Sequence, residues 1–389
     1  MERALMGDPL SKLTDDVLVD IISRVSYKST CCCQCVARRW RNLISHPDHR
    51  TKLHQPTLAG FFFESYNSTY DYPKMAQYEM GHYYTRVSND GWPHYHPSLS
   101  FLPKCKSLDI LDCCNGLLLC RCWKPTYPKT LDYVVCNPAT EKWMIVPATN
   151  WSSQVEVARL GFDQAASSHF HVFEFITDSV WGHKRGHHDG NIKAVGIYSS
   201  KTKGWSHTVT GWGNGTRISS DSKSVFFSGM LHVTTNYLVL AVDVEGNNWK
   251  IIHLPMPPCT DNATPKDIFP TQGQLYFANN GASNGFELWV LENYDSEHWT
   301  LKAKASYLEM FGTNHSYYDC GYSVISVRPE ENVFFIVCGN KASVVSYKMD
   351  SLNRNVIDDI VWSKTPYIPY VPLFSDSESL ADEHQVLLQ

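Results

Sequence analysis

The sequence predicts a mainly β protein that begins with a small α-helical domain, and three observations lead to that prediction. Apolar residues between positions 13 and 44 recur at three- and four-residue steps, as they do on one face of a helix. Short apolar or alternating runs, separated by turn residues, fill the chain after about residue 57. Four of these runs lead into similar turns that end at a tryptophan. A length of 389 residues allows two or three domains.

The first predicted helix starts directly after Leu13. Thr14 is expected to cap it, and Asp15 and Asp16 fall in its first turn, where negative charge favours the helix dipole. The apolar face of this helix comprises Leu13, Val17, Leu18, Ile21, Ile22 and Val25.

A second helix is expected to begin near Ser29 or Thr30 and to end at Pro47, because proline stops a helix. Its apolar face comprises Cys33, Val36, Ala37, Trp40, Leu43 and Ile44. About 40 residues cannot bury the apolar faces of two such helices alone. We therefore expect a partner or a neighbouring domain to cover part of them.

These helices resemble the F-box. The residues that match its pattern are Leu13, Asp16, Leu18, Ile21, Ile22, Arg24, Val25, Lys28, Ser29, Val36, Trp40, Leu43, Ile44 and Pro47. Thr14 and Ser26 depart from the pattern, since the family usually has proline there. The resemblance implies docking on a Skp-type adaptor, and through it on a cullin, by Leu13, Leu18, Ile21, Ile22, Val25, Val36, Trp40, Leu43 and Ile44. In the alternative interpretation, the helices only cap a larger domain.

The rest of the chain has an all-β pattern. The expected strands are Leu58–Phe63, Gly116–Cys120, Tyr133–Cys136, Phe170–Ile176, Ala194–Tyr198, Ser224–Phe227, Leu238–Val242, Gln274–Phe277, Glu287–Leu291, Val333–Cys338 and Ser343–Tyr347. We expect Leu58–Phe63 and Ile357–Trp362 to share or adjoin one sheet that closes a ring, because a closed ring leaves no long open edge.

A repeated turn connects several of these strands. A residue that favours turns stands six positions before a tryptophan in four places: Asn137 and Trp143, Ser199 and Trp205, Asp243 and Trp249, Asn293 and Trp299. Each tryptophan is expected to open the return strand and to lie largely buried between sheets. A weaker fifth copy runs from Asp350, with Val356 in the tryptophan position. Spacings of 62, 44 and 50 residues (143 to 205, 205 to 249, 249 to 299) resemble kelch-type β-propeller blades.

The same region resembles the F-box-associated domain of plant F-box proteins. The segments that carry this resemblance are Cys114–Cys120, Cys136–Trp143, Leu160–Asp163 and Val195–Trp205. It implies an F-box over residues 11–50, a kelch-like β-propeller over residues 57–372, and disordered ends at residues 1–10 and 373–389. The implied function is substrate recognition for a Skp–cullin–F-box ubiquitin ligase, without catalysis by this chain. Two alternatives stay open: a catalytic or carbohydrate-binding propeller, and an F-box protein that binds the adaptor without a cullin.

Two aromatic- and histidine-rich stretches are candidates for binding the unknown target protein, because binding residues gather on loops of rigid scaffolds. The first, between Asp178 and Gly190, carries Trp181, His183, His187 and His188. The second, which begins near Tyr83 and Tyr84, carries Trp92 and His94.

Composition excludes several other classes. A net charge of −5 does not favour nucleic-acid binding. The sequence contains no run of 18 apolar residues, so we expect no membrane span. Thirteen cysteines, an odd number, together with a start that lacks the apolar core of a signal peptide, suggest reduced thiols in the cytoplasm or nucleus. Cys31, Cys32, Cys33 and Cys35 contain a C-x-x-C spacing, but no second ligand pair completes a zinc site. We therefore expect neither metal nor cofactor.

Overall fold

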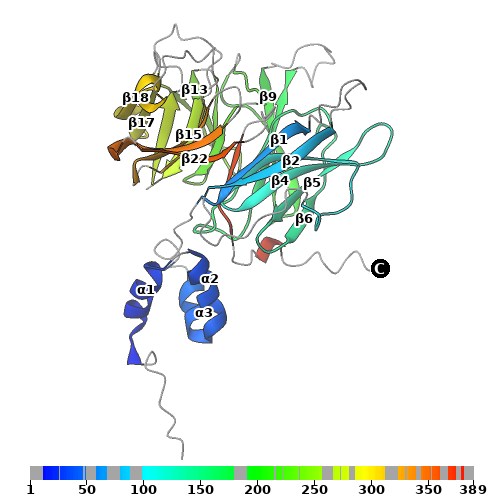
Figure 1. The fold of residues 1–389 in the computed structure, drawn as a ribbon. Coiled ribbons are helices and arrows are strands. Elements are labelled where there is room, and N and C mark those ends of the chain that lie inside the picture. The colour runs from blue at the N-terminus through cyan, green and yellow to red at the C-terminus, as the bar shows by residue number, and fades with distance from the viewer. Residues whose placement is uncertain are drawn as a thin grey trace, which may run out of the picture.

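The computed structural model contains a helical head at the N-terminal end and six β-sheets arranged as a six-blade propeller (Figure 1). The structure describes residues 12–25, 27–46, 49, 58–67, 79–87, 99–178, 191–213, 216–220, 222–235, 237–255, 266–271, 273–279, 285–311, 323–328, 331–338, 343–351, 353–359, 367–373 and 378–380.

The head consists of three short helices: α1 (Asp15–Ser23), α2 (Tyr27–Val36) and α3 (Arg38–Ser45). Its buried cluster contains Leu18, Val19, Ile22, Leu43 and Ile44, with Leu13, Cys33 and Trp40 partly buried against them. All of these residues belong to the head itself, and Figure 1 draws the head below the sheets. The helices therefore have a core of their own, which disfavours the interpretation that they merely cap the propeller.

Two details of the head differ from the prediction. Thr14 occupies the N-cap of α1, but its side chain makes no capping hydrogen bond. The predicted second helix is broken at Ala37, whose backbone is extended. The break reorients the residues after it, so that Trp40, Leu43 and Ile44 pack on α1 while Val36 stays 70% exposed.

Five of the sheets are four-stranded antiparallel blades whose strands follow one another along the chain. We number them in chain order. Blade I holds β3 (Ser107–Cys114), β4 (Leu117–Trp123), β5 (Leu131–Asn137) and β6 (Lys142–Val146); blade II holds β7 (Ala158–Gly161), β8 (His171–Thr177), β9 (Ile192–Ser199) and β10 (Gly204–Val209); blade III holds β11 (Ser224–Phe227), β12 (Met230–Thr234), β13 (Leu238–Asp243) and β14 (Trp249–His253).

Blade IV holds β15 (Lys266–Thr271), β16 (Gln274–Asn279), β17 (Gly285–Asn293) and β18 (His298–Ser306); blade V holds β19 (Ser323–Arg328), β20 (Val333–Cys338), β21 (Ser343–Lys348) and β22 (Asn353–Asp359). Helix α6 (Tyr307–Phe311) follows blade IV, and η3 (Met349–Ser351) lies between the last two strands of blade V. Every strand expected from the sequence over residues 116–347 lies within or overlaps one of these strands.

Blade VI closes the ring with strands from both ends of the propeller. β1 (Gly60–Asn67) pairs with β2 (Glu79–Arg86) on one side and with β23 (Ile368–Tyr370) on the other. The predicted closure is therefore confirmed for Leu58–Phe63. The described part of Ile357–Trp362 does not share this sheet, since residues up to Asp359 form the end of β22 in blade V, but it adjoins the sheet, because Ile357 packs against the cluster that contains Phe61 and Phe63. The chain closes instead through the short, proline-containing β23.

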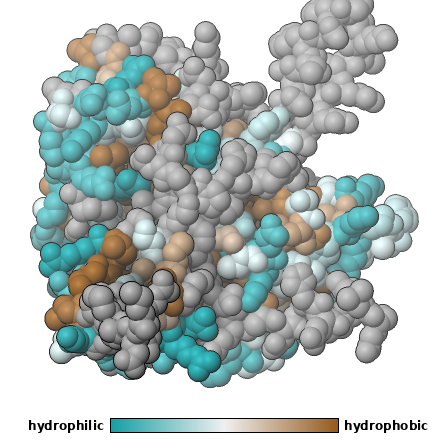
Figure 2. All heavy atoms as spheres, turned by 60° about the horizontal axis from the view of Figure 1, so that its bottom comes forward, coloured by the Kyte–Doolittle hydropathy of each residue, from teal (hydrophilic) through white to brown (hydrophobic). Residues whose placement is uncertain are grey.

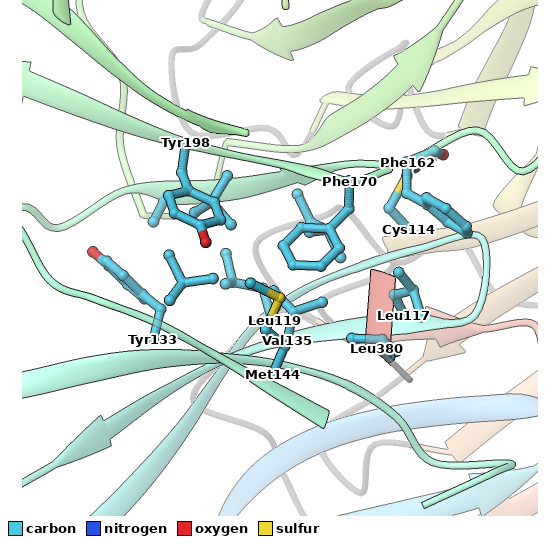
Figure 3. Close-up of a cluster of buried hydrophobic side chains, with 14 of the residues drawn as sticks. Cys114, Leu117, Leu119, Tyr133, Val135, Met144, Phe162, Phe170, Tyr198 and Leu380 are labelled. Carbon is cyan, nitrogen blue, oxygen red and sulfur yellow. Dashed lines mark hydrogen bonds between the residues drawn. The ribbon is translucent and has the colours of Figure 1, made fainter. Parts of the chain in front are cut away.

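The core is a series of apolar clusters between neighbouring blades. Figure 3 shows the cluster between blades I and II, where Phe170 and Tyr198 face Leu119, Val135 and Met144. Equivalent clusters fill the other interfaces, including one between blades V and VI around Phe61 and Phe335. Stability therefore comes mainly from blade-to-blade contact, and each blade needs both neighbours.

The four predicted tryptophans do occupy equivalent positions, directly after the turn between the third and fourth strands of blades I to IV. Trp143 is buried, whereas the other three are half-buried, less than expected. The fifth copy is displaced by two residues, because Val356 pairs with Val345 in mid-strand and is exposed. In the pairing register of blade V, Arg354 stands where the other blades have tryptophan.

The loops of the propeller divide between two faces. Inner strands of neighbouring blades contact one another, so the first strand of each blade lies nearest the axis. Turns between first and second strands, and between third and fourth strands, share one face, which we call the turn face. Loops between second and third strands, and connections that follow a fourth strand, share the opposite face, which we call the loop face. Because β1 is a second strand, the chain enters the propeller from the head at the turn face (Figure 1).

Part of the C-terminal segment is packed rather than disordered. Leu373 and Leu380 are buried in the cluster between blades I and II, and η4 (Glu378–Leu380) contacts β6. Asn137 Nδ2 donates a 2.7 Å hydrogen bond to the carbonyl of Leu373. Gly116 has a φ of +87°, and a Cβ there would collide with Leu373. The prediction of disorder over residues 373–389 is therefore wrong for Leu373 and residues 378–380.

Candidate adaptor-binding and target-binding surfaces

An exposed apolar stripe runs along α1 and just past its end. Val17, Ile21 and Val25 are 45%, 43% and 40% exposed, and they follow one another at four-residue steps. Leu18 and Ile22, one position further along, point into the head and are buried. The helix thus has two apolar faces, one of which packs internally while the other meets solvent.

The nine residues predicted to bind the adaptor fall into three groups. Leu18, Ile22, Leu43 and Ile44 are buried in the head, and Leu13 and Trp40 are partly buried there. Ile21, Val25 and Val36 are exposed and available for direct contact. Val17 joins this exposed stripe, although it was not among the nine. Its spacing of four residues from Ile21 is the signal that identifies it.

An ion pair fixes the relative orientation of α1 and α3. The Arg39 guanidinium donates to Asp15 Oδ1 at 2.6 and 2.9 Å and to the carbonyl of Leu13 at 2.6 Å. Contacts to a charged partner from two nitrogens make this a geometrically specific link. It holds the start of α1 beside α3, so the exposed stripe is presented on a fixed frame.

The residues predicted to bind the target lie outside the described part of the chain. Trp181, His183, His187 and His188 fall within residues 179–190, and Trp92 and His94 within residues 88–98. The first stretch leaves and rejoins the propeller at its loop face, between second strand β8 and third strand β9, whereas the second stretch follows β2, which ends at the turn face beside the start of β1. The start of the second stretch is corrected: Tyr83 and Tyr84 lie on β2, and Tyr84 is buried against Phe62.

The ends of the first stretch are held together. Asp178 Oδ1 accepts a 3.0 Å hydrogen bond from the Asn191 amide, and the Asp178 amide donates to the Asn191 carbonyl at 2.9 Å. Asn191 also forms a β-bridge with Arg217, in the segment between blades II and III. Residues 179–190 therefore begin and end at one fixed point on the loop face.

The buried thiols in blade I are packing groups rather than nucleophiles. Burial raises the pKa values of Cys113, Cys114 and Cys122 above the usual thiol range, and a hydrogen bond with Cys136, together with burial, raises the pKa of Cys120, so these thiols stay protonated. Among the described residues, no group of three or more His, Cys, Asp or Glu side chains is placed to hold a metal ion. Within the same residues, no helix has the length and apolar character needed to cross a membrane.

Comparison with known families agrees with this geometry. Residues 10–52 match the F-box domain, and residues 92–374 match the F-box associated beta propeller domain. The chain belongs to the F-box associated β-propeller family. In this family, an F-box followed by a propeller is the arrangement of an F-box substrate-recognition protein.

Individual relatives of this F-box protein were also found. F-box protein At5g07610 of Arabidopsis thaliana is 25% identical over 341 residues, which cover 82% of this chain and 78% of the relative. A chain from the crystal structure of a nidogen/laminin complex is 9% identical, covers 68% of this chain and 84% of its own length, and has a TM-score of 0.38.

Proposed function

We propose that this chain is the substrate-recognition subunit of a Skp–cullin–F-box ubiquitin ligase. The head binds a Skp-type adaptor, which links it to the cullin, and the loop face of the propeller binds a target protein. The chain itself makes and breaks no bond. It accelerates ubiquitination by holding the target near a charged ubiquitin-conjugating enzyme, which raises the effective concentration of the two reactants.

The observation that carries this proposal is the exposed stripe of Val17, Ile21 and Val25 on an F-box head with its own core. Side chains of this kind cost free energy when they stay in water, and a partner helix groove would cover them. The position of the stripe also fits, because the head joins the turn face and leaves the loop face free for a target.

Ile21→Asp tests the proposal more cleanly than a change at Ile22, which would introduce a charge into the head core. We expect co-purification of the adaptor with the full chain to fall at least tenfold, because a carboxylate would lose hydration in the interface. Val209→Asp is the matched control, since Val209 is 76% exposed on the outer strand of blade II.

Circular dichroism must show that the Ile21→Asp chain keeps its folded content. Adaptor binding that is unchanged in this folded variant would refute the proposed docking surface. Cullin co-purification separates the ligase from an F-box protein that uses the adaptor alone. If the adaptor is retained and the cullin is absent, the ligase assignment fails.

A further inference from the structure

The loop between β4 and β5 of blade I projects into solvent with an aromatic residue at its tip. All seven residues from Lys124 to Thr130 are exposed, and Tyr127 is fully exposed, more than any other large apolar side chain among the described residues. A tyrosine ring buries a large area on binding at small entropic cost, because it has only two side-chain torsions. Tyr127 can therefore bury a large area against a partner with little loss of side-chain freedom.

The loop is held in shape by its own hydrogen bonds. The Lys124 amide donates to the Thr130 carbonyl at 2.9 Å, and the Thr126 hydroxyl lies 2.7 Å from the Thr130 hydroxyl. The Thr130 amide donates to Thr126 Oγ1 at 3.1 Å, and the Lys124 ammonium pairs with Asp132 at 2.7 Å. Tyr127 is therefore presented by a preorganised loop, which lowers the ordering cost of binding.

The strands beneath the loop are equally fixed. The Arg121 guanidinium lies 5.8 Å from the ring centre of Trp123 and 5.9 Å from that of Tyr133, and it donates to the Val155 carbonyl at 2.8 Å. Trp123 Nε1 donates to Asp109 Oδ2 at 2.7 Å, which ties the second strand of the blade to the first. The loop thus stands on a rigid base at the interface of blades I and II.

The position of the loop agrees with a role in target binding. It joins a second strand to a third strand, so it lies on the loop face, opposite the side where the head enters. Figure 2, which turns the lower side of Figure 1 forward, shows the coloured apolar residues of that side in groups separated by hydrophilic ones.

We propose that residues 124–130 form a contact arm for the target protein, in which Tyr127 enters an apolar pocket and Lys129 faces an acidic rim. This inference rests on the proposed function and names the chemistry of its partner. Tyr127 supplies most of the binding free energy, as buried aromatic residues do at the centre of interfaces. Lys129 gives the arm positive charge, which selects acidic surfaces and speeds association, whereas Lys124 is already paired with Asp132.

Photo-crosslinking from the tip of the arm serves two purposes: it identifies the target protein, and it tests whether the arm contacts that protein. The full chain carrying p-benzoylphenylalanine at position 127 is expressed with the proteasome inhibited, irradiated, and the crosslinked protein is identified by mass spectrometry. The affinity of that purified protein is then measured for the chain in complex with its adaptor. We expect Tyr127→Ala to weaken binding at least tenfold and Tyr127→Phe to change it less than about threefold.

Lys129→Ala should weaken binding a few-fold at low salt, and this effect should vanish near 0.5 M salt, where exposed charges are screened. Val209→Ala, on the outer strand of blade II, should leave the affinity unchanged. Unchanged affinity in the Tyr127→Ala chain would overturn the contact arm. Adaptor binding distinguishes the two proposals: the Tyr127→Ala chain should retain the adaptor, whereas a wild-type chain that binds no adaptor contradicts the ligase function itself.

Discussion

At the scale of single residues, His232 shows how burial changes the pKa of a side chain. This fully buried side chain on β12 has its Nε2 2.6 Å from the Tyr294 hydroxyl and its Nδ1 3.2 Å from the Met230 carbonyl. The Lys250 ammonium lies 4.0 Å from the centre of the Tyr294 ring and pairs with Asp295 at 2.7 Å. Burial lowers the pKa of His232 to about 4, and the nearby Lys250 charge acts in the same direction.

The propeller should therefore lose stability in mild acid. Between pH 6.5 and about 4 the unfolded histidine binds a proton that the buried one does not, so the free energy of unfolding falls as the pH drops. The full loss from this residue is on the order of 3 kcal/mol. His171, whose pKa is also lowered to about 4, should add to the loss. Urea unfolding at several pH values measures it.

His232→Gln supplies the comparison, because glutamine keeps hydrogen-bonding groups but does not titrate. We expect a shallower decline between pH 6.5 and 4 in this variant, whatever its stability at neutral pH. An identical decline in both chains would show that His232 is protonated in the folded state.

At the scale of elements, the tryptophan turns act as links between blades. Trp205 Nε1 of blade II donates to the Pro147 carbonyl after blade I at 2.7 Å, and Trp299 Nε1 of blade IV donates to the His253 carbonyl of blade III at 2.9 Å. Trp212, between blades II and III, packs its ring edge-on against Trp249 at 4.6 Å and donates to the Ala241 carbonyl at 3.1 Å. The indoles of Trp205, Trp299 and Trp212 thus each combine ring packing with a hydrogen bond across the gap between blades.

Truncating these tryptophans should have unequal effects. Trp143→Ala should cost about 3–5 kcal/mol of unfolding free energy, the usual range for a buried aromatic. Trp205→Ala should cost less, about 1–3 kcal/mol, because its side chain is half-buried. Trp205→Phe keeps the ring near Tyr198 and loses the hydrogen bond, so it should cost roughly 1 kcal/mol. Urea unfolding followed by circular dichroism ranks the three variants. Equal losses of unfolding free energy in all three would contradict the proposed dependence on burial and on the hydrogen bond between blades.

Local signals explain which elements could be predicted from the sequence. The repeated turn and its tryptophan fit within seven consecutive residues. The third and fourth strands of blades I to IV, which this turn connects, could therefore be predicted from the sequence. The fifth copy failed because Arg354 replaces the tryptophan and lies 5.6 Å from the ring of Phe311, a contact that no spacing reveals. Glu141, Lys203 and Glu297 have positive φ two residues before their tryptophans, although none of these residue types indicates that conformation.

The candidate sites were also only partly predictable from the sequence. The apolar periodicity of the head predicted its helices, but not which residues of α1 pack internally and which stay exposed, because both faces are apolar. Tyr127 gave no signal in the sequence, since its importance follows from exposure on a rigid loop. The aromatic stretches with Trp92 and Trp181 remain predictions, because both lie outside the described residues.

At the scale of the whole molecule, three residues of β23 complete the ring. Their strand pairs with β1 and contacts the inner strands of blades I and V, so it joins the start of the propeller to its end. Leu373 and Leu380 then extend this closure over the turn face, beside Leu117 and Phe162 in the cluster of Figure 3. A closed ring protects every inner strand edge, and that protection depends on residues near the end of the chain.

Two truncations separate the strand from the segment after it. Removing residues 367–389 takes away β23 and exposes the inner edge of β1, so we expect the propeller to lose cooperative unfolding or to fail to fold. Removing residues 376–389 keeps β23 but deletes Leu380, which should cost about 2–4 kcal/mol and lower Tm by roughly 5–10 °C. Leu380→Ala in the full chain should reproduce most of that shift. Leu308→Ala is the control, because Leu308 is 48% exposed on α6. If the longer truncation melts cooperatively at the same temperature as the full chain, the ring does not depend on β23 for closure.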